Sequence, residues 1–494
     1  MAATSDALIS QGEVEQEDLL SKLPDDVLLS ILKNLDLRDF VRSSTLSRRW
    51  RHLPGELLDI VLDVDSFKPK DDDGFKSTSS DTARSNMALV YAAKNLLGRK
   101  GQRPIRHLAV TFYLRFESMG IVRAVDDAMS PDRGGRGVAT AEFTIRGEKM
   151  DLLCSEGDMV RHAKRFLSYF NACPRAFAGL TGLHVESVKL GESDMPTVLR
   201  ACQKLKWLSL LNCDTGGETV LVLEHPQLTD LKLDSCNCDG VELRWLPELC
   251  EVSCWSWCPS RHGCPLLFGH VPRLRRLRLC TAGYAEYTTL KLSELLVNYA
   301  SLGELYLNFQ CNRIWIKPEH PEHLTPLLQN LGAVNLDNIS EECDLTWTLF
   351  LLQCAPFLKM LQIKVSSHQC IPFTDKMNKL LQMYFGCRSK NMEWELPDFK
   401  HYNLAVLHIF GFQPGNKFMG YIRRVMEAAV NLEEIALLDL WCEDCGFRPV
   451  TRYPRTKQER DFIRTQINEG VISPMKTIQF YQTSSEEPNI KILD

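Results

Sequence analysis

Five cysteine and histidine side chains in one short stretch have the residue types of a zinc site. They are Cys250, Cys254, Cys258, His262 and Cys264. The first four are spaced four residues apart, which could place them on one face of a helix. The close Cys-x-x-Cys pair of most structural zinc sites is absent, and Cys254 falls at an inward position of a predicted strand. The stretch therefore favours structural thiols over a metal site.

A second thiol pair, Cys442 and Cys445, has the Cys-x-x-Cys spacing, but no second pair lies near it in the sequence. The sequence also contains no G-x-x-x-x-G-K-[ST] phosphate loop, no H-E-x-x-H zinc motif and no G-x-S-x-G nucleophile motif. We therefore expect no metal and no cofactor, and a protein that is not itself an enzyme.

The chain as a whole carries a net charge of −5 over 494 residues, which does not favour general binding to nucleic acid or to an anionic membrane. No apolar run reaches the eighteen or so residues of a membrane-spanning helix. The N-terminus lacks the basic and apolar regions of a secretion signal. The 18 cysteines are then expected to be free thiols in a reducing compartment, the nucleus or the cytoplasm.

A repeated pattern, L-x-x-L-x-L, accounts for most of the remaining chain. Successive copies are typically 21 to 29 residues apart, as from Leu228 to Leu249 and from Leu302 to Leu331, which is the period of leucine-rich repeats. Eleven copies occur, beginning at Ile105, Leu180, Leu205, Leu228, Leu249, Leu274, Leu302, Leu331, Leu358, Leu404 and Leu432. The 46-residue interval from Leu358 to Leu404 and other irregular spacings predict inserted loops. A coincidence of leucines in a helical protein is the alternative.

Each copy predicts a short strand whose leucines point into a core shared by neighbouring repeats. Cys213 and Cys236 occupy the position where a small side chain turns the chain out of the strand. The predicted fold is α/β, an irregular solenoid with parallel strands on its concave face and helices or loops on its convex face. In the basic segment Arg273–Leu279, the leucines then point into the core and Arg276 and Arg278 face the concave sheet surface, so this segment does not predict nucleic-acid binding.

The same register predicts the side chains of the concave face, where solenoids usually bind their ligands. The candidates are Trp207, Ser209, Asp230, Lys232, Arg276, Arg278, Glu304, Tyr306, Asn335, Gln362, Lys364 and His408. Charged residues mixed with aromatic ones suit a protein partner. The alternative is that most of them are solvated surface residues.

A helical segment precedes the repeats. Pro24 and the carboxylates of Asp25 and Asp26 predict a helix start, and Val27 begins an apolar series at helical spacing. After a predicted turn at 36–39, a second amphipathic helix ends near Pro54. Two or three such helices are too small to bury their own apolar surface. They are expected either to bind a partner or to cap the open end of the repeats.

This segment resembles an F-box, with its Leu-Pro opening and with Leu-Ser-Arg-Arg-Trp at 46–50 where the family has Val-Ser-Lys-Arg-Trp. The resemblance implies binding to a Skp-type adaptor and, through it, to a cullin–RING ubiquitin ligase. Matching positions imply adaptor contacts, or support for them, from Leu23, Pro24, Val27, Leu28, Ile31, Leu32, Leu35, Leu46 and Trp50.

The remaining chain resembles plant F-box/leucine-rich-repeat proteins that end in an FBD-type segment. The residues that carry this are HYNLAVLHIFGF (His401–Phe412) and YIRRVMEAAVNLEEIAL (Tyr421–Leu437). The expected organisation is a disordered arm (1–17), an F-box (18–54), a leucine-rich-repeat solenoid with inserted loops (55–400), FBD-like terminal repeats (401–450) and a C-terminal extension (451–494). The resemblance implies a substrate-recognition subunit whose protein substrate is unknown. A repeat scaffold whose F-box is only a structural cap is the alternative.

Overall fold

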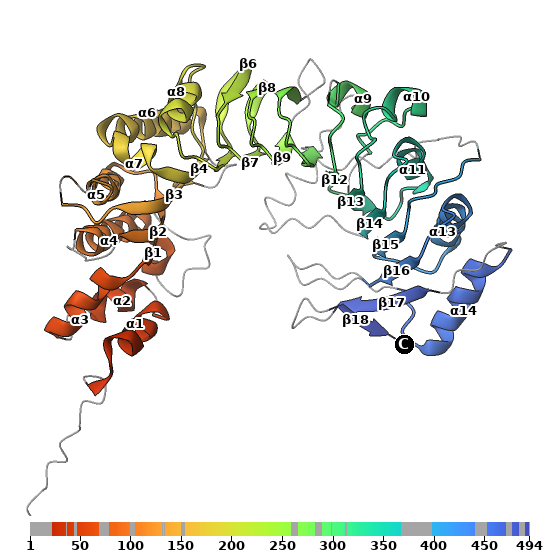
Figure 1. The fold of residues 1–494 in the computed structure, drawn as a ribbon, viewed down its shortest axis with the longest axis horizontal. Helices are drawn as coiled ribbons and strands as arrows, with labels where there is room; N and C mark the ends of the chain where they lie inside the picture. Colours follow the sequence, from red (N-terminus) through yellow and green to blue (C-terminus); the bar gives the residue numbers. More distant parts are fainter. Residues whose placement is uncertain are drawn as a thin grey trace, which may run out of the picture.

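The computed structural model describes residues 22–35, 37–43, 47–68, 79–98, 104–130, 132, 134–149, 154–257, 265–281, 289–297, 299–311, 314–366, 398–439, 452–470, 477–483 and 490–493. The chain forms an arch, with the first helices at one foot and the last strands at the other (Figure 1). The expected disordered arm at 1–17 and the inserted loop between Leu358 and Leu404 lie wholly or largely outside these residues.

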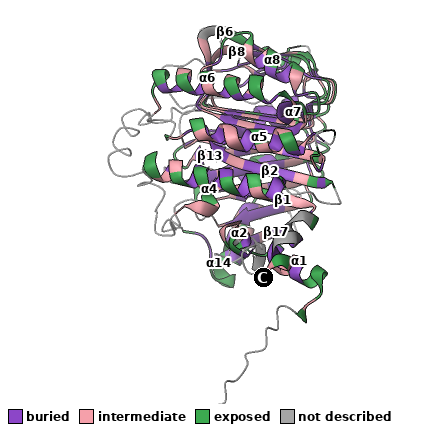
Figure 2. Cartoon of the chain, turned by 90° about the vertical axis from the view of Figure 1, so that its left-hand side faces the viewer, coloured by how far each residue is buried: buried purple, intermediate pink, exposed green. Residues whose placement is uncertain are grey.

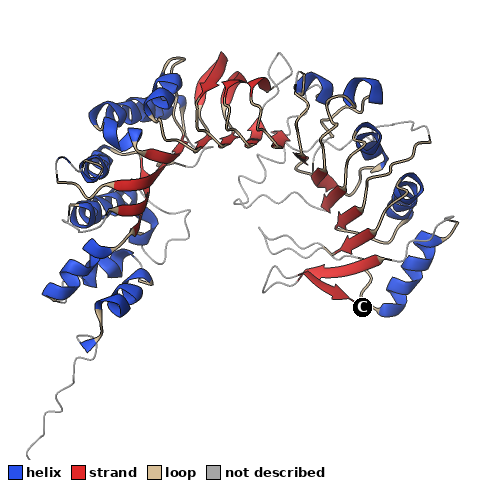
Figure 3. Ribbon diagram, in the orientation of Figure 1, coloured by secondary structure: helices blue, strands red, loops and turns tan. Residues whose placement is uncertain are grey.

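One large sheet follows the inner side of the arch (Figure 3). Fifteen strands of the described part of the chain lie in it in sequence order, and all neighbours are parallel except the last pair. The strands are β1 (Asp59–Asp63), β2 (Ile105–Tyr113), β3 (Val138–Arg146), β4 (Leu180–Glu186), β5 (Trp207–Leu211), β7 (Asp230–Asp234), β9 (Glu251–Trp257), β11 (Arg276–Thr281), β12 (Glu304–Asn308), β13 (Ala333–Ser340), β14 (Met360–Ser366), β15 (Val406–Phe410), β16 (Glu434–Leu438), β17 (Ile478–Thr483) and β18 (Ile490–Leu493).

All eleven L-x-x-L-x-L copies contribute a strand to this sheet, and their leucines are in register. Leu208 of β5, for example, lies beside Leu183 of β4 on one side and Leu231 of β7 on the other. These leucines are at most 1% exposed and belong to one hydrophobic core that continues along the chain. The register arises because alternate side chains of a strand point to opposite faces, so leucines two residues apart share the buried face.

Most helices lie on the outer side of the arch and turn their apolar faces toward the sheet (Figure 2). They are α4 (Ser79–Leu97), α5 (Met119–Ala128), α6 (Glu156–Ala172), α7 (Pro174–Ala178), α8 (Asp194–Ala201), α9 (Leu292–Leu295), α10 (Pro321–Leu324), α11 (Leu349–Cys354), α13 (Asn416–Ala428) and α14 (Lys457–Asn468). The start of helix α6 is fixed by a capping box. The Ser155 hydroxyl accepts a hydrogen bond from the Asp158 N–H, and the Asp158 carboxylate accepts one from the Ser155 N–H.

The outer layer differs from the expectation of helices and loops at the top of the arch. There a second parallel sheet is formed by β6 (Asp214–Glu224), β8 (Asn237–Trp245) and β10 (Leu266–His270), in the order β10-β8-β6 (Figure 1). Leu221 and Leu223 of β6 and Val241 and Leu243 of β8 are buried, and the residue between each pair, Val222 or Glu242, is partly exposed. This alternation with a period of two favours a strand, because a helix would scatter these apolar residues around its surface.

The turns out of several inner strands share a backbone conformation. Ser187, Asn212 and Ser235 have φ angles of 53°, 50° and 52°, in the left-handed region where Asn and small polar residues are best tolerated. The residue after Asn212 is Cys213, whose thiol donates to the carbonyl oxygen of Val185 at 3.5 Å. Cys213 therefore lies at the turn where the sequence predicts it, and its thiol connects two neighbouring repeats.

Candidate functional site

Three short helices form the N-terminal foot of the arch: α1 (Asp25–Lys33), α2 (Leu37–Ser43) and α3 (Arg48–His52). The expected turn at 36–39 is wrong from Leu37 onward, because α2 already begins there, and the expected second helix is divided in two. Ser47 begins α3, its hydroxyl accepting a hydrogen bond from the Trp50 N–H at 3.3 Å. A serine at this position satisfies a backbone donor that the helix cannot.

The buried faces of these helices join the core of the large sheet. Leu28, Leu32, Phe40 and Trp50 are at most 6% exposed and belong to the same hydrophobic cluster as Ile60 of β1. Arg49 links α3 to the start of α1, because it donates to the Asp25 carboxylate at 2.7 Å and to the Leu23 carbonyl at 2.5 Å. The three helices are thus attached to the sheet through one face.

Beside the packed face, α1 and the residues that flank it carry an apolar edge that is open to solvent. Val27 is 38% exposed and Leu35 37% exposed, Pro24 is exposed, and Leu23 and Ile31 are half-buried. Of the nine residues implied by the F-box resemblance, Pro24, Val27 and Leu35 are exposed, Leu23 and Ile31 are half-buried, and Leu28, Leu32 and Trp50 are buried, while Leu46 lies outside the described residues. An exposed apolar stripe on a short helix is typical of a partner site.

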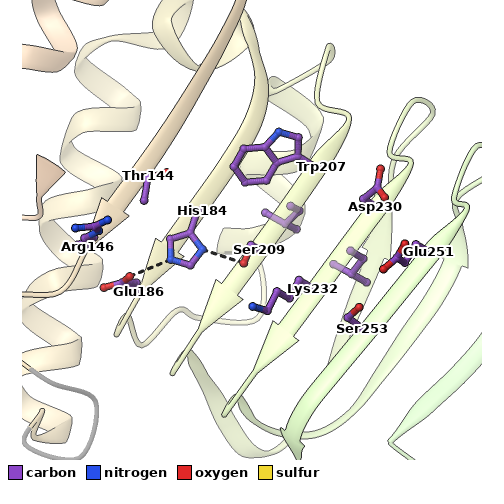
Figure 4. Close-up of a pocket in the computed structure, with 12 residues that line it drawn as sticks. Thr144, Arg146, His184, Glu186, Trp207, Ser209, Asp230, Lys232, Glu251 and Ser253 are labelled. Carbon is purple, nitrogen blue, oxygen red and sulfur yellow. Dashed lines mark hydrogen bonds and ion pairs between the residues drawn. The ribbon is translucent and has the colours of Figure 1, made fainter. Parts of the chain in front are cut away.

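A groove lies on the inner face of the large sheet, in its N-terminal half (Figure 4). Its volume is about 530 Å³, and strands β3, β4, β5, β7 and β9 form it. The lining residues are Thr144, Arg146, His184, Glu186, Trp207, Leu208, Ser209, Asp230, Leu231, Lys232, Glu251 and Ser253. Four of the predicted face residues, Trp207, Ser209, Asp230 and Lys232, are thus brought together in one hollow.

Three groove residues form a hydrogen-bonded row across β4 and β5. His184 Nδ1 lies 2.9 Å from the Ser209 hydroxyl, and His184 Nε2 lies 3.0 Å from the Glu186 carboxylate (Figure 4). These are the residue types of a hydrolytic triad, which also needs donors for the developing oxyanion. The backbone N–H groups of β4 and β5 lie in the plane of the sheet and pair with neighbouring strands, so they do not point into the groove. The row orders the groove floor and lacks the backbone oxyanion donors of a hydrolase.

Trp207 forms the aromatic wall of the groove. Its strand position is directly beside Gly182 of β4, and a Cβ atom built on Gly182 would lie closer than 3.0 Å to indole ring atoms. The indole therefore lies flat over the glycine backbone, which only a residue without a side chain permits.

A second group of aromatic and charged side chains lies farther along the inner face. The rings of Trp255 and Tyr306 are 5.8 Å apart, and the Arg278 guanidinium lies 5.9 Å from the centre of the Tyr306 ring. The Tyr306 hydroxyl donates to the Asp337 carboxylate, and burial raises the pKa of this phenol well above its usual value. Lys364 also contacts Asp337, at 3.7 Å.

The remaining predicted face residues also lie on the inner face, none of them buried. Asn335 donates to Glu304 at 3.2 Å, and His408 lies 3.9 Å from Glu434. Burial lowers the pKa of His408. Many of the predicted face residues therefore already have polar partners within the sheet. Fewer of them are available to a ligand than the register alone suggested.

Some groove residues were absent from the prediction. Glu251 and Ser253 occupy the same repeat positions as predicted residues, so the register rule would have found them, as it would His184 on β4. Thr144 and Arg146 lie on β3, a strand that matches no L-x-x-L-x-L copy because its buried residues are Ala141, Phe143 and Ile145.

Several cysteines among the described residues have buried thiols with raised pKa values. Burial raises the pKa of Cys202 and of Cys280 to about 12, and raises that of Cys254 well above its ordinary value. No cluster of three or more His, Cys, Asp or Glu side chains with the geometry to hold a metal occurs within the described ranges. Cys258, His262, Cys264, Cys442 and Cys445 lie outside them. Within the same ranges, no helix is both long and apolar enough to cross a bilayer.

Comparison with known proteins shows two levels of similarity. The F-box domain family matches residues 20–55. F-box/FBD/LRR-repeat protein At1g13570 of Arabidopsis thaliana is 38% identical over 403 residues, which cover 77% of this chain and 84% of that protein. F-box/FBD/LRR-repeat protein At1g80470 from the same plant is 21% identical over 78% of this chain and 80% of its own length.

Other relatives match over less of their length. The alignments with F-box protein At1g80960 and Putative F-box protein At3g58860, both of Arabidopsis thaliana, are 42% and 25% identical over 10% and 45% of this chain, and cover 11% and 47% of these relatives. The match to At1g13570 combines an identity of 38% with coverage of more than three quarters of both chains. The chain therefore belongs to the family of F-box/FBD/LRR-repeat proteins.

Proposed function

We propose that this chain is the substrate-recognition subunit of an SCF-type (Skp–cullin–F-box) E3 ubiquitin ligase. Helices α1 to α3 would bind a Skp-type adaptor, and the inner face of the sheet would bind a protein substrate. The observation that carries this proposal is that α1 and its flanking residues have, beside the face packed on the sheet core, an exposed apolar stripe at Pro24, Val27 and Leu35. A helix that served only as a cap would need only the packed face.

Ubiquitin transfer would then be catalysed by the partners, and this chain would supply proximity between the substrate and the charged conjugating enzyme. It would act without metal, cofactor, nucleic acid or membrane, in the nucleus or the cytoplasm. The inner strands and the outer layer would form an irregular leucine-rich-repeat solenoid over 55–400. The F-box would span 18–54, the FBD-like repeats 401–450 and an extension 451–494, after a disordered arm at 1–17.

The decisive experiment is calorimetric titration of the whole chain with a plant Skp-type adaptor. We expect one-to-one binding that the double substitution Val27→Asp and Leu35→Asp weakens by about 10- to 1,000-fold, because each buried carboxylate would replace an apolar contact of about 1–2 kcal/mol. Ser30→Asp is the control, since it adds one of these two negative charges at an exposed polar position of α1. All variants should keep their thermal stability, because exposed substitutions usually change it by less than about 0.5 kcal/mol.

The scaffold alternative makes the opposite prediction. A folded wild-type chain that shows no heat of binding with the adaptor would contradict the ligase proposal and support an F-box that serves only as a cap. The variant Leu23→Asp with Pro24→Ala separates the two again. Loss of adaptor binding with an intact fold supports the ligase subunit, and unfolding of the sheet supports the cap.

A further inference from the structure

The charges of the groove are mostly compensated within the protein. Arg146 lies 2.6 Å from the Asp65 carboxylate. Glu186 accepts from His184 and from the Gly147 N–H at 3.0 Å. Glu251 is paired with two arginines of β11, at 2.7 and 3.1 Å. Groups that already have partners of opposite charge gain little from a ligand.

Three polar groups remain open toward the groove. Over the described residues, neither the Lys232 ammonium nor the Trp207 indole N–H has a hydrogen-bond or ion-pair partner, and both side chains are solvent-accessible. The Asp230 carboxylate is exposed, and its hydrogen bond comes from the adjacent Thr229 hydroxyl at 2.6 Å. The groove thus offers one cation, one anion and one aromatic face.

The strand register fixes the arrangement of these groups. Asp230 lies directly beside Trp207, and Lys232 directly beside Ser209, on neighbouring parallel strands. Asp230 and Lys232 are two residues apart on β7, so their Cα atoms are about 6.6 Å apart along the strand and both point to the inner face. Figure 4 shows Asp230 near the Trp207 end of the groove and Lys232 toward its other end.

Each position favours a ligand group of opposite character. A lysine or arginine side chain beside Trp207 and Asp230 would gain both contact with an aromatic face and a carboxylate partner. A carboxylate near Lys232 would complete the second pair. Side chains two residues apart in an extended peptide lie on one side at the same spacing of about 6.6 Å, so a peptide running along β7 would present both charges at once.

We propose that this groove binds an extended segment of the protein substrate in which a basic residue and an acidic residue are separated by one residue. The basic side chain lies against Trp207 and Asp230, and the acidic side chain against Lys232. This inference rests on the proposed function, because it specifies the substrate of the same inner face. It favours a peptide over a small molecule because the two charged sites are set apart along an open groove rather than enclosed together.

The test uses the whole chain and an array of immobilised ten-residue peptides of Gly and Ser. Each peptide carries one Arg and one Glu, in either order and with zero to three residues between them, at about 50 mM salt to limit screening. We expect the strongest binding for one intervening residue in one of the two orders. Replacing Arg or Glu by Gln in that peptide should weaken binding by about three- to tenfold.

The charge exchange Asp230→Lys with Lys232→Asp is the decisive variant. It keeps the composition and net charge and changes two exposed side chains, so the fold should persist. The preferred order of Arg and Glu should then reverse. Lys206→Asp is the control for a charge reversal outside the groove lining, where Lys206 is an exposed lysine, and it should leave the preferred order unchanged.

The aromatic contact has its own pair of variants. Trp207→Ala should remove most of the preference for Arg over Gln, whereas Trp245→Ala should leave it unchanged, since Trp245 is an exposed tryptophan of the outer sheet. A binding signal that ignores the spacing, or an order that does not reverse in the exchanged variant, would overturn the inference. Equal competition by unlinked free arginine and glutamate would also overturn it, in favour of small charged ligands.

Adaptor titration of the same sample separates this inference from the proposed function, because the array needs no adaptor. Adaptor binding without any peptide preference would refute the groove inference alone. A peptide preference without adaptor binding would refute the ligase role and leave the groove as the binding site of a scaffold.

Discussion

The close approach of Trp207 to Gly182 allows a quantitative test of the groove. Gly182→Ala places a methyl group closer than 3.0 Å to the indole ring, so the ring must rotate away from the inner face of β4. Forcing one extra carbon into a packed contact costs about 1–3 kcal/mol. Alanine itself is better than glycine in a strand by about 0.5–1 kcal/mol, which offsets part of that cost.

These opposing terms can be separated by a double-mutant cycle. In the Trp207→Ala background the clash is gone, so Gly182→Ala should stabilise the chain by about 0.5–1 kcal/mol. The coupling free energy between the two sites should therefore be about 1–3 kcal/mol, the size of the clash. Gly303→Ala is the control, because a Cβ atom there would meet Arg275 O at an ordinary 3.6 Å and no ring.

Equilibrium urea unfolding of the four proteins, followed by circular dichroism, gives the free energies of unfolding. Near-ultraviolet circular dichroism would report the displaced indole directly. A coupling below about 0.5 kcal/mol, the usual limit of additivity, would refute the placement of the indole over Gly182. It would also remove the aromatic wall from the groove.

Three further results are expected. Burial lowers the pKa of His225 and His401, so the unfolded chain binds more protons than the folded chain below about pH 6.5, and the free energy of unfolding should fall as the pH drops below that value. The double variant His225→Gln with His401→Gln should show a smaller fall when unfolding is measured across this pH range. An unchanged fall would contradict the lowered pKa values of the two histidines. Leu277→Ala, at a fully buried position of β11, should lower the free energy of unfolding by about 2–5 kcal/mol in urea titration. Ser155→Ala removes the cap of α6 and should cost about 1 kcal/mol in the same assay, whereas no change would mean that the cap is dispensable.

The inner strands could be predicted from the sequence because their signal is repeated and each repeat obeys the same geometry. Every L-x-x-L-x-L copy contributes a strand, and the alternation correctly separated buried leucines from inner-face residues such as Lys232. Strand β3 was missed because Phe143 and Ile145 fill the core in place of leucines. The core requires apolar volume of the right size, and leucine is only its commonest source.

The outer sheet and the groove depend on information that the repeat pattern does not contain. The alternation of buried and exposed residues in β6 would be the same in a strand of the inner sheet. Periodicity alone therefore cannot tell to which of the two sheets a strand belongs. The groove depends on pairing between distant strands, such as Arg276 with Glu251, which decides which charges remain open. The register identifies the residues of a face, but only the folded sheet shows which of them are already neutralised.

The outer sheet has a consequence for the shape of the arch. Parallel strands stand about 4.8 Å apart, whereas packed helices need about 8–10 Å. Where helices back the inner strands, the outside of each repeat is wider than the inside and the chain must bend. Where β6, β8 and β10 back them, both layers have the same spacing and no bend is imposed. Figure 1 shows a nearly straight top between two steep sides, and the groove from β3 to β9 spans the corner where bending stops. The length of the outer sheet would thus act as a spacer that sets the distance between the two feet of the arch.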